Sequence, residues 1–259
     1  MTVHEHAAHP APSELPFAAA EIVIEAGRPG AVLDVGCGSG RLTVELARAG
    51  AAVTGIDTSQ ARLADAQERT AQASVELRLL RADMNDRLPF EDDTFDAVVS
   101  RLALMVARDP VATLRESARV LRPGGVVVTA VWAAVEQNPW FGEARSAVAE
   151  ALGDEPARFA HAFGRLGSRD ELEQVHRSAG FGEVRGRTLN DAVRAVDAAQ
   201  HWAYLTHSIG HYTRIAATLS PKTAERLLDV LAARLAPYRV AGELVMPRRI
   251  VLVTARRPA

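Results

Sequence analysis

Short apolar runs alternate along the chain with stretches in which apolar residues recur every three or four positions. The runs are rich in Val, Ile and Leu, which is typical of buried strands, and the stretches between them are typical of helices that cover a sheet. We expect strands over 31–35, 52–56, 75–81, 97–100 and 126–132, and helices over 42–49, 60–73 and 111–121. This order predicts a doubly wound α/β domain with a parallel sheet covered on both faces.

The alternation ends near Trp132. Segments 133–177 and 191–240 have helical or irregular patterns, and strands are expected over 181–189 and 249–255. Asp109 before Pro110 and the capping-box run from Ser168 to Glu171 both indicate helix starts. We expect the two segments to form a helical cap over one edge of the sheet.

Residues 1–30 are expected to form an N-terminal arm and a helix that precede the domain at 31–259. The first 14 residues lack hydrophobic periodicity, and a helix is expected over 15–26, before the turn from Gly27 to Gly30. The three histidines of the arm could bind a metal, but they are more typical of a solvated tail.

Composition excludes several classes of protein. The 259 residues include 30 Lys and Arg against 32 Asp and Glu, a net charge of −2, so nucleic acid and anionic membranes are not expected partners. No apolar run approaches the roughly 20 residues of a membrane span. The single cysteine, Cys37, and a start unlike a signal peptide lead us to expect a cytoplasmic protein.

The run from Val32 to Gly40 places a glycine at every second position immediately after a strand. Such a loop lets a ligand approach the backbone at the carboxyl end of the sheet, although glycines also permit tight packing of a strand against a helix. The spacing is G-x-G-x-G, and Arg41 stands one residue after Gly40, so the dinucleotide pattern G-x-G-x-x-G fits less well.

Acidic residues end the next two expected strands. Asp57 lies about 20 residues after the first glycine, where a carboxylate can bind both hydroxyls of a ribose, or else act as a helix N-cap. Asp83 can accept from an adenine amino group, with Met84 against the ring, or else serve as a turn residue. Together the strand ends describe a site for an adenosine-containing ligand.

These segments resemble class I S-adenosylmethionine-dependent methyltransferases, of the small-molecule type similar to ubiquinone and menaquinone biosynthesis methyltransferases. The resemblance is carried by VLDVGCGSG at 32–40, GIDTS at 55–59, RADMNDRLPFEDDTFDAVVS at 81–100, RVLRPGGVVV at 119–128 and, in outline, RSAGFGEV at 177–184. It implies a Rossmann-like, seven-stranded, doubly wound sheet with a helical cap, and S-adenosylmethionine as cofactor. The cofactor-binding residues that it implies are Asp34, Gly36, Gly38, Gly40, Asp57, Thr58, Asp83, Met84 and Ser100.

Within that resemblance, the glycines admit the methionine part, Asp57 holds the ribose, and Asp83 with Met84 holds the adenine. Asp34 and Ser100 would line the methionine end, although Asp34 could instead brace the loop and Ser100 could simply end a strand. Many relatives carry a histidine after the fourth strand, and the segment 101–105 here has none.

The segment 200–212 concentrates titratable and aromatic side chains. On one helix His201, Tyr204, Ser208 and His211 would share a face, and His207 lies four residues before His211. We take His207 and His211 as candidate general bases; a helix whose histidines are exposed or hydrogen-bonded is the ordinary alternative. The spacing also suits metal ligands, but no HExxH pattern supplies a third, so no metal is expected.

Candidate substrate-binding residues are Arg101, Trp140, His201 and Tyr204. Trp140 lies in the turn 136–141, which could equally serve packing. The expected function is transfer of a methyl group to O, N or C of a small molecule, for which orientation can suffice without a dedicated base. The alternative is a protein of this fold that catalyses a non-methylating reaction, such as cyclisation, or serves as a ligand-binding accessory protein. The pattern leaves the oligomeric state open.

Overall fold

The computed structural model describes residues 30–153 and 164–259, so the arm and the helix expected before residue 30 lie outside the described residues. The described chain divides into two compact units. The sheet unit comprises residues 30–133, 164–189 and 250–259, and the helix-rich unit comprises residues 134–153 and 190–249. The assignment of a cap stays a prediction.

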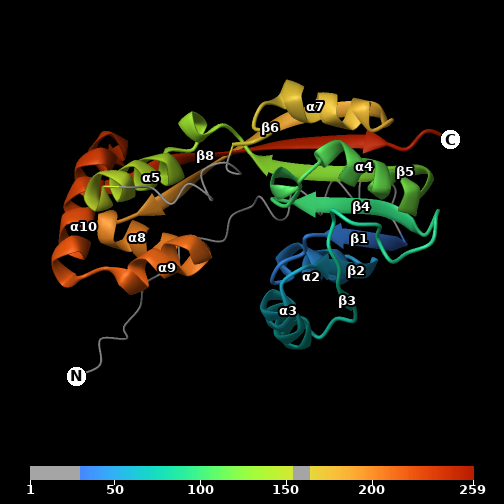
Figure 1. Ribbon diagram of the computed structural model, residues 1–259, viewed down its shortest axis with the longest axis horizontal. Helices are drawn as coiled ribbons and strands as arrows, with labels where there is room; N and C mark the ends of the chain where they lie inside the picture. Colours follow the sequence, from blue (N-terminus) through green and yellow to red (C-terminus); the bar gives the residue numbers. More distant parts are fainter. Residues whose placement is uncertain (1–29, 154–163) are drawn as a thin grey trace. The chain divides into compact units, whose positions relative to one another are not determined.

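A mostly parallel sheet organises the chain (Figure 1), and its strands follow one another in the order β3-β2-β1-β4-β5-β8-β6, with β7 paired to β8. Strands β1 to β5 pair in parallel, whereas β5 and β8 are antiparallel. The strands are β1 Ala31–Val35, β2 Ala52–Asp57, β3 Arg78–Arg81, β4 Phe95–Arg101, β5 Leu121–Trp132, β6 Gly182–Ala195, β7 Arg239–Val240 and β8 Glu243–Arg256. The seven strands of the main path confirm the expected α/β architecture.

Helices cover both faces of the sheet. On one face Leu114 of α4 and Leu172 of α7 belong to a buried cluster with Val98 and Val127 of the sheet. On the other face α2 contributes Leu42 and Leu46 to a second cluster. The helices are α2 Arg41–Arg48, α3 Gln60–Ala73, α4 Pro110–Val120, α5 Pro139–Leu152, α7 Arg169–Ser178, α8 Ala198–Ser208, α9 Gly210–Thr218 and α10 Pro221–Leu235. Burial on both faces explains the uninterrupted apolar strands.

The helix starts that the sequence signals are present. The carboxylate of Asp109 accepts hydrogen bonds from two backbone N–H groups of α4, whose first residue is Pro110. Ser168 and Glu171 form the reciprocal capping box of α7. Each such cap satisfies N–H groups that a helix end leaves without an intrahelical partner.

Four strand boundaries were predicted wrongly. β3 begins at Arg78 rather than at residue 75, and β5 begins at Leu121 rather than at residue 126. β6 continues to Ala195, and β8 begins at Glu243. The segment 190–195 has the composition of a helix, yet Val193 and Ala195 are buried while Arg194 between them is exposed. Burial of alternate side chains selects the strand here, because tertiary packing overrides a weak helix propensity.

Ion pairs join elements within the helix-rich unit. Arg234 of α10 makes ion pairs with Glu143 at 3.1 Å and Glu150 at 3.2 Å, both on α5. Arg248 of β8 is buried and pairs with Asp191 of β6. No helix within residues 30–153 and 164–259 is long and apolar enough to cross a membrane.

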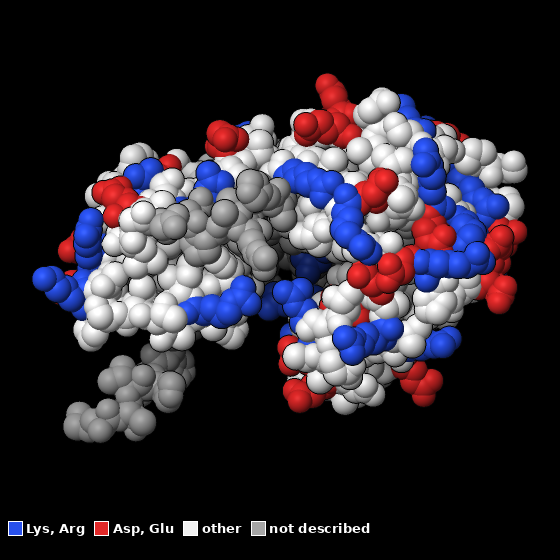
Figure 2. All heavy atoms as spheres, in the orientation of Figure 1, with Lys and Arg blue, Asp and Glu red and all other residues white. Residues whose placement is uncertain are grey.

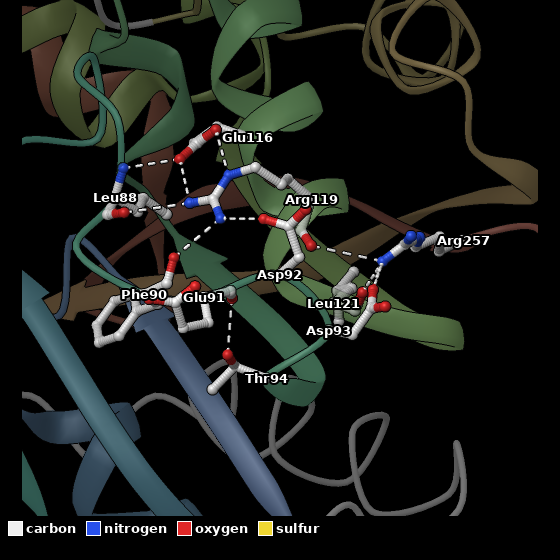
Figure 3. Close-up of polar contacts among 10 residues, drawn as sticks. All are labelled: Leu88, Phe90, Glu91, Asp92, Asp93, Thr94, Glu116, Arg119, Leu121 and Arg257. Atoms are coloured by element: carbon white, nitrogen blue, oxygen red, sulfur yellow. Dashed lines mark hydrogen bonds and ion pairs between the residues drawn. The ribbon is translucent and has the colours of Figure 1, made fainter.

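A network around Arg119 fixes the loop between β3 and β4 (Figure 3). The guanidinium donates to both carboxylate oxygens of Glu116, to Asp92, and to the carbonyls of Leu88 and Phe90. These bonds raise the pKa of Arg119 and hold the pKa of Glu116 below its usual range. Much of the family-like run at 81–100 therefore has a structural role.

Charges of both signs are interspersed on the face of the molecule that Figure 2 shows. The near-balance of 30 basic and 32 acidic residues fits this pattern. This face carries no large field of one sign of the kind that concentrates nucleic acid or an anionic membrane.

Candidate functional site

The predicted cofactor residues lie at one edge of the sheet unit. Strands β1 to β4 are parallel, so their carboxyl ends meet at this edge (Figure 1). Open α/β sheets bind ligands there. The structure thus brings together the glycine loop after β1, the acids after β2 and β3, and the polar end of β4.

The glycine loop turns through left-handed backbone conformations. Gly36, Gly38 and Gly40 have φ of 74°, 55° and 76°, a region that other residues rarely adopt. A Cβ on Gly36 would lie 2.3 Å from the Cβ of Ala103, so this position has no room for a side chain. The segment after β4 therefore packs directly against the loop after β1.

Asp57 holds the loop in place. One carboxylate oxygen accepts the N–H of Gly38 at 3.0 Å, and the other accepts the N–H of Ser59 at 2.8 Å. The N-cap of α3 is Ser59, so the alternative in which Asp57 caps that helix was wrong. The next residue, Thr58, accepts through its carbonyl from Arg81 at 3.1 Å, which ties the ends of β2 and β3. A carboxylate can accept further bonds, so both anchors leave Asp57 able to bind hydroxyls.

Asp34 is a buried carboxyl group beside the loop. Its side chain is 1% exposed and accepts a hydrogen bond from the hydroxyl of Thr43 at 2.7 Å. Burial raises the pKa of Asp34 from 3.8 to about 6, while Thr43 and the charge of Arg101 act in the opposite direction and that of Asp57 adds to the rise. A group poised near neutrality in this way is typical of functional sites.

The turn after β3 positions Asp83 and Met84. One oxygen of Asp83 accepts from the backbone and side-chain N–H groups of Asn85, at 2.9 and 2.7 Å. The side-chain oxygen Oδ1 of Asn85 accepts from the backbone N–H of Arg108 at 2.7 Å. Met84 packs against the buried cluster under the sheet. Asp83 thus takes part in a turn, which was the structural alternative, and keeps a second carboxylate oxygen for a ligand.

Ser100, the residue before the last one of β4, has a buried hydroxyl that lacks a partner among the described residues. Ser100 is 6% exposed, and its Oγ has no hydrogen-bond partner within the described chain. Two residues later Leu102 has φ of 60°, while its N–H donates to the carbonyl of Ala130. Buried polar atoms without partners and left-handed non-glycine residues both concentrate at functional sites.

Burial suppresses the reactivity of Cys37. The thiol is partly buried beside the acids of the loop, and burial, followed by the charges of Asp34 and Asp57, raises the pKa of Cys37 well above its usual range. A Cβ on Gly55 would lie 3.0 Å from its sulfur. The thiol therefore packs the loop after β1 against Gly55 of β2. It is a poor nucleophile, because only a thiolate reacts readily.

Three of the candidate substrate residues lie together in the helix-rich unit. His201 of α8 is buried, and its Nε2 lies 2.7 Å from the carbonyl oxygen of Trp140. The Tyr204 ring stacks beside that of His201 at 6.4 Å and meets that of Trp140 edge-on at 6.3 Å. The fourth candidate, Arg101, ends β4 in the sheet unit.

The single helical face expected for this segment is wrong. Helix α8 ends at Ser208 and α9 begins at Gly210, with Ile209 between them in an extended conformation at φ −128° and ψ 102°. His207 and His211 therefore lie on different helices, and the spacing argument that joined them no longer applies. Among the residues that the structure describes, no group of three His, Cys, Asp or Glu side chains is arranged to hold a metal ion.

Sequence reasoning missed residues that act through contacts between separate segments of the chain. Thr43, Asn85 and Ala103 orient the site, and each does so by touching a residue that only the fold brings near. Asn85 carries a signal, because an Asp followed two residues later by Asn is typical of a side-chain-stabilised turn. Ala103 carries none that a single sequence could reveal.

Comparison with known proteins agrees with this geometry. Residues 33–129 match a family model described as a methyltransferase domain. A ubiquinone biosynthesis O-methyltransferase of Alkalilimnicola ehrlichii is 35% identical over 108 residues, 42% of this chain and 42% of that protein. The chain spans less than half the length of the curated relatives that it matches; for two of them the matched part is 36% and 47% of the relative's length.

Solved structures share the fold over nearly the whole chain. A putative methyltransferase from Bacillus halodurans has a TM-score of 0.63 at 17% identity, covering 94% of this chain and 100% of that one. The [4+2]-cyclase SpnF has a TM-score of 0.60 at 22% identity, covering 99% of this chain and 85% of that one. At these identities the likeness concerns the fold alone.

Proposed function

We propose that this chain, whose residues 33–129 match a methyltransferase domain, transfers the methyl group of S-adenosylmethionine to a small-molecule acceptor. The observation that carries the proposal is the position of Asp57, whose carboxylate joins the end of β2 to the N–H of Gly38 in the glycine loop. A carboxylate and an open backbone side by side suit a ribose and the chain that extends from it.

Other strand ends fit the same cofactor. Asp83 and Met84 would hold the adenine, and Thr58 would lie beside the ribose. Asp34 and the unpartnered hydroxyl of Ser100 would face the methionine end, where ammonium and carboxylate groups offer partners of both kinds. Gly36, Gly38 and Gly40 leave that end free of side chains.

Orientation is the chain's main contribution to the reaction. When bound, S-adenosylmethionine supplies a methyl group on a sulfonium sulfur, which an acceptor attacks in line. The residues at the strand ends fix the cofactor, and a fixed geometry alone is worth effective molarities of about 10⁵ to 10⁸ M. Candidate acceptor contacts are Arg101, Trp140, His201 and Tyr204. His207 and His211 remain separate candidates for removing a proton from the acceptor.

The proposal includes a cytoplasmic setting and no nucleic-acid or membrane partner. The interspersed charges of Figure 2 and the single, unreactive thiol of Cys37 support these parts. Whether the acceptor atom is O, N or C is part of what the experiment identifies.

The test is release of S-adenosylhomocysteine from S-adenosylmethionine, with a native small-molecule extract as the acceptor pool. Asp57→Ala is the loss variant, and Asp65→Ala, on the exposed side of α3, is its matched control. We expect release by the wild type and by Asp65→Ala, and little by Asp57→Ala. A labelled methyl group then identifies the product.

A non-methylating reaction is the second candidate. The SpnF neighbour, described as a cyclase, has the same fold, and a fold does not fix a function. Cofactor binding without any release of S-adenosylhomocysteine would favour this candidate over methyl transfer.

A further inference from the structure

Two fully buried histidines of this chain differ in how their ring nitrogens are used. His176 of α7 places Nδ1 2.7 Å from the carbonyl oxygen of Leu172 and Nε2 3.1 Å from the hydroxyl of Thr129. Because a carbonyl only accepts, Nδ1 carries the proton and donates, and Nε2 accepts from Thr129. Both nitrogens of His176 are therefore satisfied within the sheet unit.

His201 has only one of its nitrogens engaged. Its Nε2 lies 2.7 Å from the Trp140 carbonyl, so Nε2 carries the proton and Nδ1 keeps a lone pair. Nδ1 is buried and has no hydrogen-bond partner within the described chain. Buried polar atoms nearly always have a hydrogen-bond partner, because burying such an atom without one costs free energy. His201 thus resembles His176 in having one ring nitrogen that donates to a backbone carbonyl, but its second nitrogen has no hydrogen-bond partner among the described residues.

The orientation of the His201 ring is set by another helix. His176 donates to the carbonyl four residues earlier in its own helix, a local bond that any buried histidine on a helix can make. His201 instead donates to Trp140, whose own Nε1–H is donated to Asn138 at 3.1 Å. The Asn138 oxygen also accepts from the N–H of Arg249 at 2.8 Å. This chain of bonds fixes which nitrogen of His201 lacks a proton.

The surroundings of His201 are aromatic. Tyr204 stacks beside its ring at 6.4 Å, and the Trp140 ring meets that of Tyr204 at 6.3 Å. Burial lowers the pKa of His201 to about 4, so the ring is neutral at physiological pH. A neutral acceptor with a fixed tautomer among aromatic rings suits a small aromatic ligand that donates one hydrogen bond.

We propose that Nδ1 of His201 accepts a hydrogen bond from the O–H or N–H group of a small aromatic ligand bound in the helix-rich unit. His201 would thereby select ligands that carry such a donor over those that lack it. Identifying the ligand as the methyl acceptor rests on the proposed function, whereas the binding itself does not. The interaction is a hydrogen bond, and no proton transfer is involved.

The test observes Nδ1 directly in the full chain, without cofactor. Protein labelled with ¹⁵N at histidine is titrated with phenol and, separately, with anisole, which has the same ring but no donor. We expect phenol to shift the His201 Nδ1 resonance upfield and to saturate, while the nitrogens of His176 stay unmoved. Phenol should bind about tenfold more tightly than anisole, which corresponds to one good hydrogen bond.

The variant His201→Gln separates selection from folding. A glutamine amide can still donate to Trp140 but places no acceptor where Nδ1 stands. We expect the preference for phenol over anisole to fall to about one, with anisole affinity little changed. Thermal unfolding in the absence of phenol and anisole checks that the variant is folded. The titration of the wild type tests the proposal even if the variant does not fold.

Three results would overturn the proposal. The first is a His201 Nδ1 whose resonance already has the position of a hydrogen-bonded nitrogen and does not move with phenol, as a bound water would cause. The second is equal affinity of the wild type for phenol and anisole. The third is no binding of phenol. None of them involves S-adenosylmethionine, so each leaves the release of S-adenosylhomocysteine as an independent test of the proposed function.

Discussion

Replacing Gly36 by alanine tests how tightly the glycine loop packs. Alanine at φ 74° is strained by about 1–2 kcal/mol. Its Cβ would also lie 2.3 Å from the Cβ of Ala103, and overpacking of this kind costs about 1–3 kcal/mol. Gly36→Ala should therefore destabilise the fold by about 2–5 kcal/mol.

Gly38→Ala is the matched control, because it has the same backbone strain without the overlap. The atom that would lie nearest to its Cβ is 3.9 Å away, at the end of the Arg62 side chain. We expect Gly38→Ala to cost only the backbone part, about 1–2 kcal/mol. Urea unfolding followed by circular dichroism measures both free energies of unfolding.

A second substitution isolates the contact. Ala103→Gly removes the clashing Cβ and leaves Cα of residue 103 at 3.8 Å, so in the Gly36→Ala background it should relieve the overlap of about 1–3 kcal/mol. After the cost of the new glycine the net gain is up to about 2 kcal/mol. In the wild-type background the same change should lower the free energy of unfolding by about 1 kcal/mol, because glycine increases the conformational entropy of the unfolded chain. Additive effects in the two backgrounds, or a Gly36→Ala loss no larger than that of Gly38→Ala, would refute the packing of these two segments.

Two further predictions concern charged groups. The pKa of Asp34 is raised from 3.8 to about 6, so ionising it opposes folding as pH rises through this range; Asp34→Asn, which can keep the bond from Thr43, should be more stable than the wild type at pH 7.5 by up to about 3 kcal/mol, with the gain vanishing below pH 4. A gain that thermal melts find independent of pH would contradict this. Arg119→Lys keeps the charge but cannot span the carboxylates and carbonyls of Figure 3, so it should lose about 2–4 kcal/mol in urea unfolding. The exposed Arg48→Lys should lose under about 0.5 kcal/mol, and equal losses would argue against the network.

The edge of the sheet that brings the candidate cofactor residues together could be predicted because its signals are local. The glycines after β1, Asp57 at the end of β2 and Asp83 two residues after β3 can each be placed at a strand end without knowledge of the rest of the chain. Parallel strands bring those ends together. The architecture of the sheet unit followed for the same reason.

The remaining features depend on contacts between distant segments. The extension of β6 to Ala195 arises from burial of alternate side chains against a fold that the local composition does not reveal. The break at Ile209 separates His207 from His211 although a glycine at 210 is only a weak break signal. That His201 keeps an open nitrogen follows from the Trp140 carbonyl, 61 positions away in the sequence.

Calorimetric titration of S-adenosylmethionine into the full chain tests the central claim, that the carboxyl ends of β1 to β4 form its binding site. We predict saturable binding by the wild type and by Asp65→Ala. Asp57→Ala removes the carboxylate to which the ribose hydroxyls would donate, so it should weaken binding by about 2 kcal/mol or more, a factor of about 30. Equal affinity in all three proteins, or no binding by the wild type, would contradict the account.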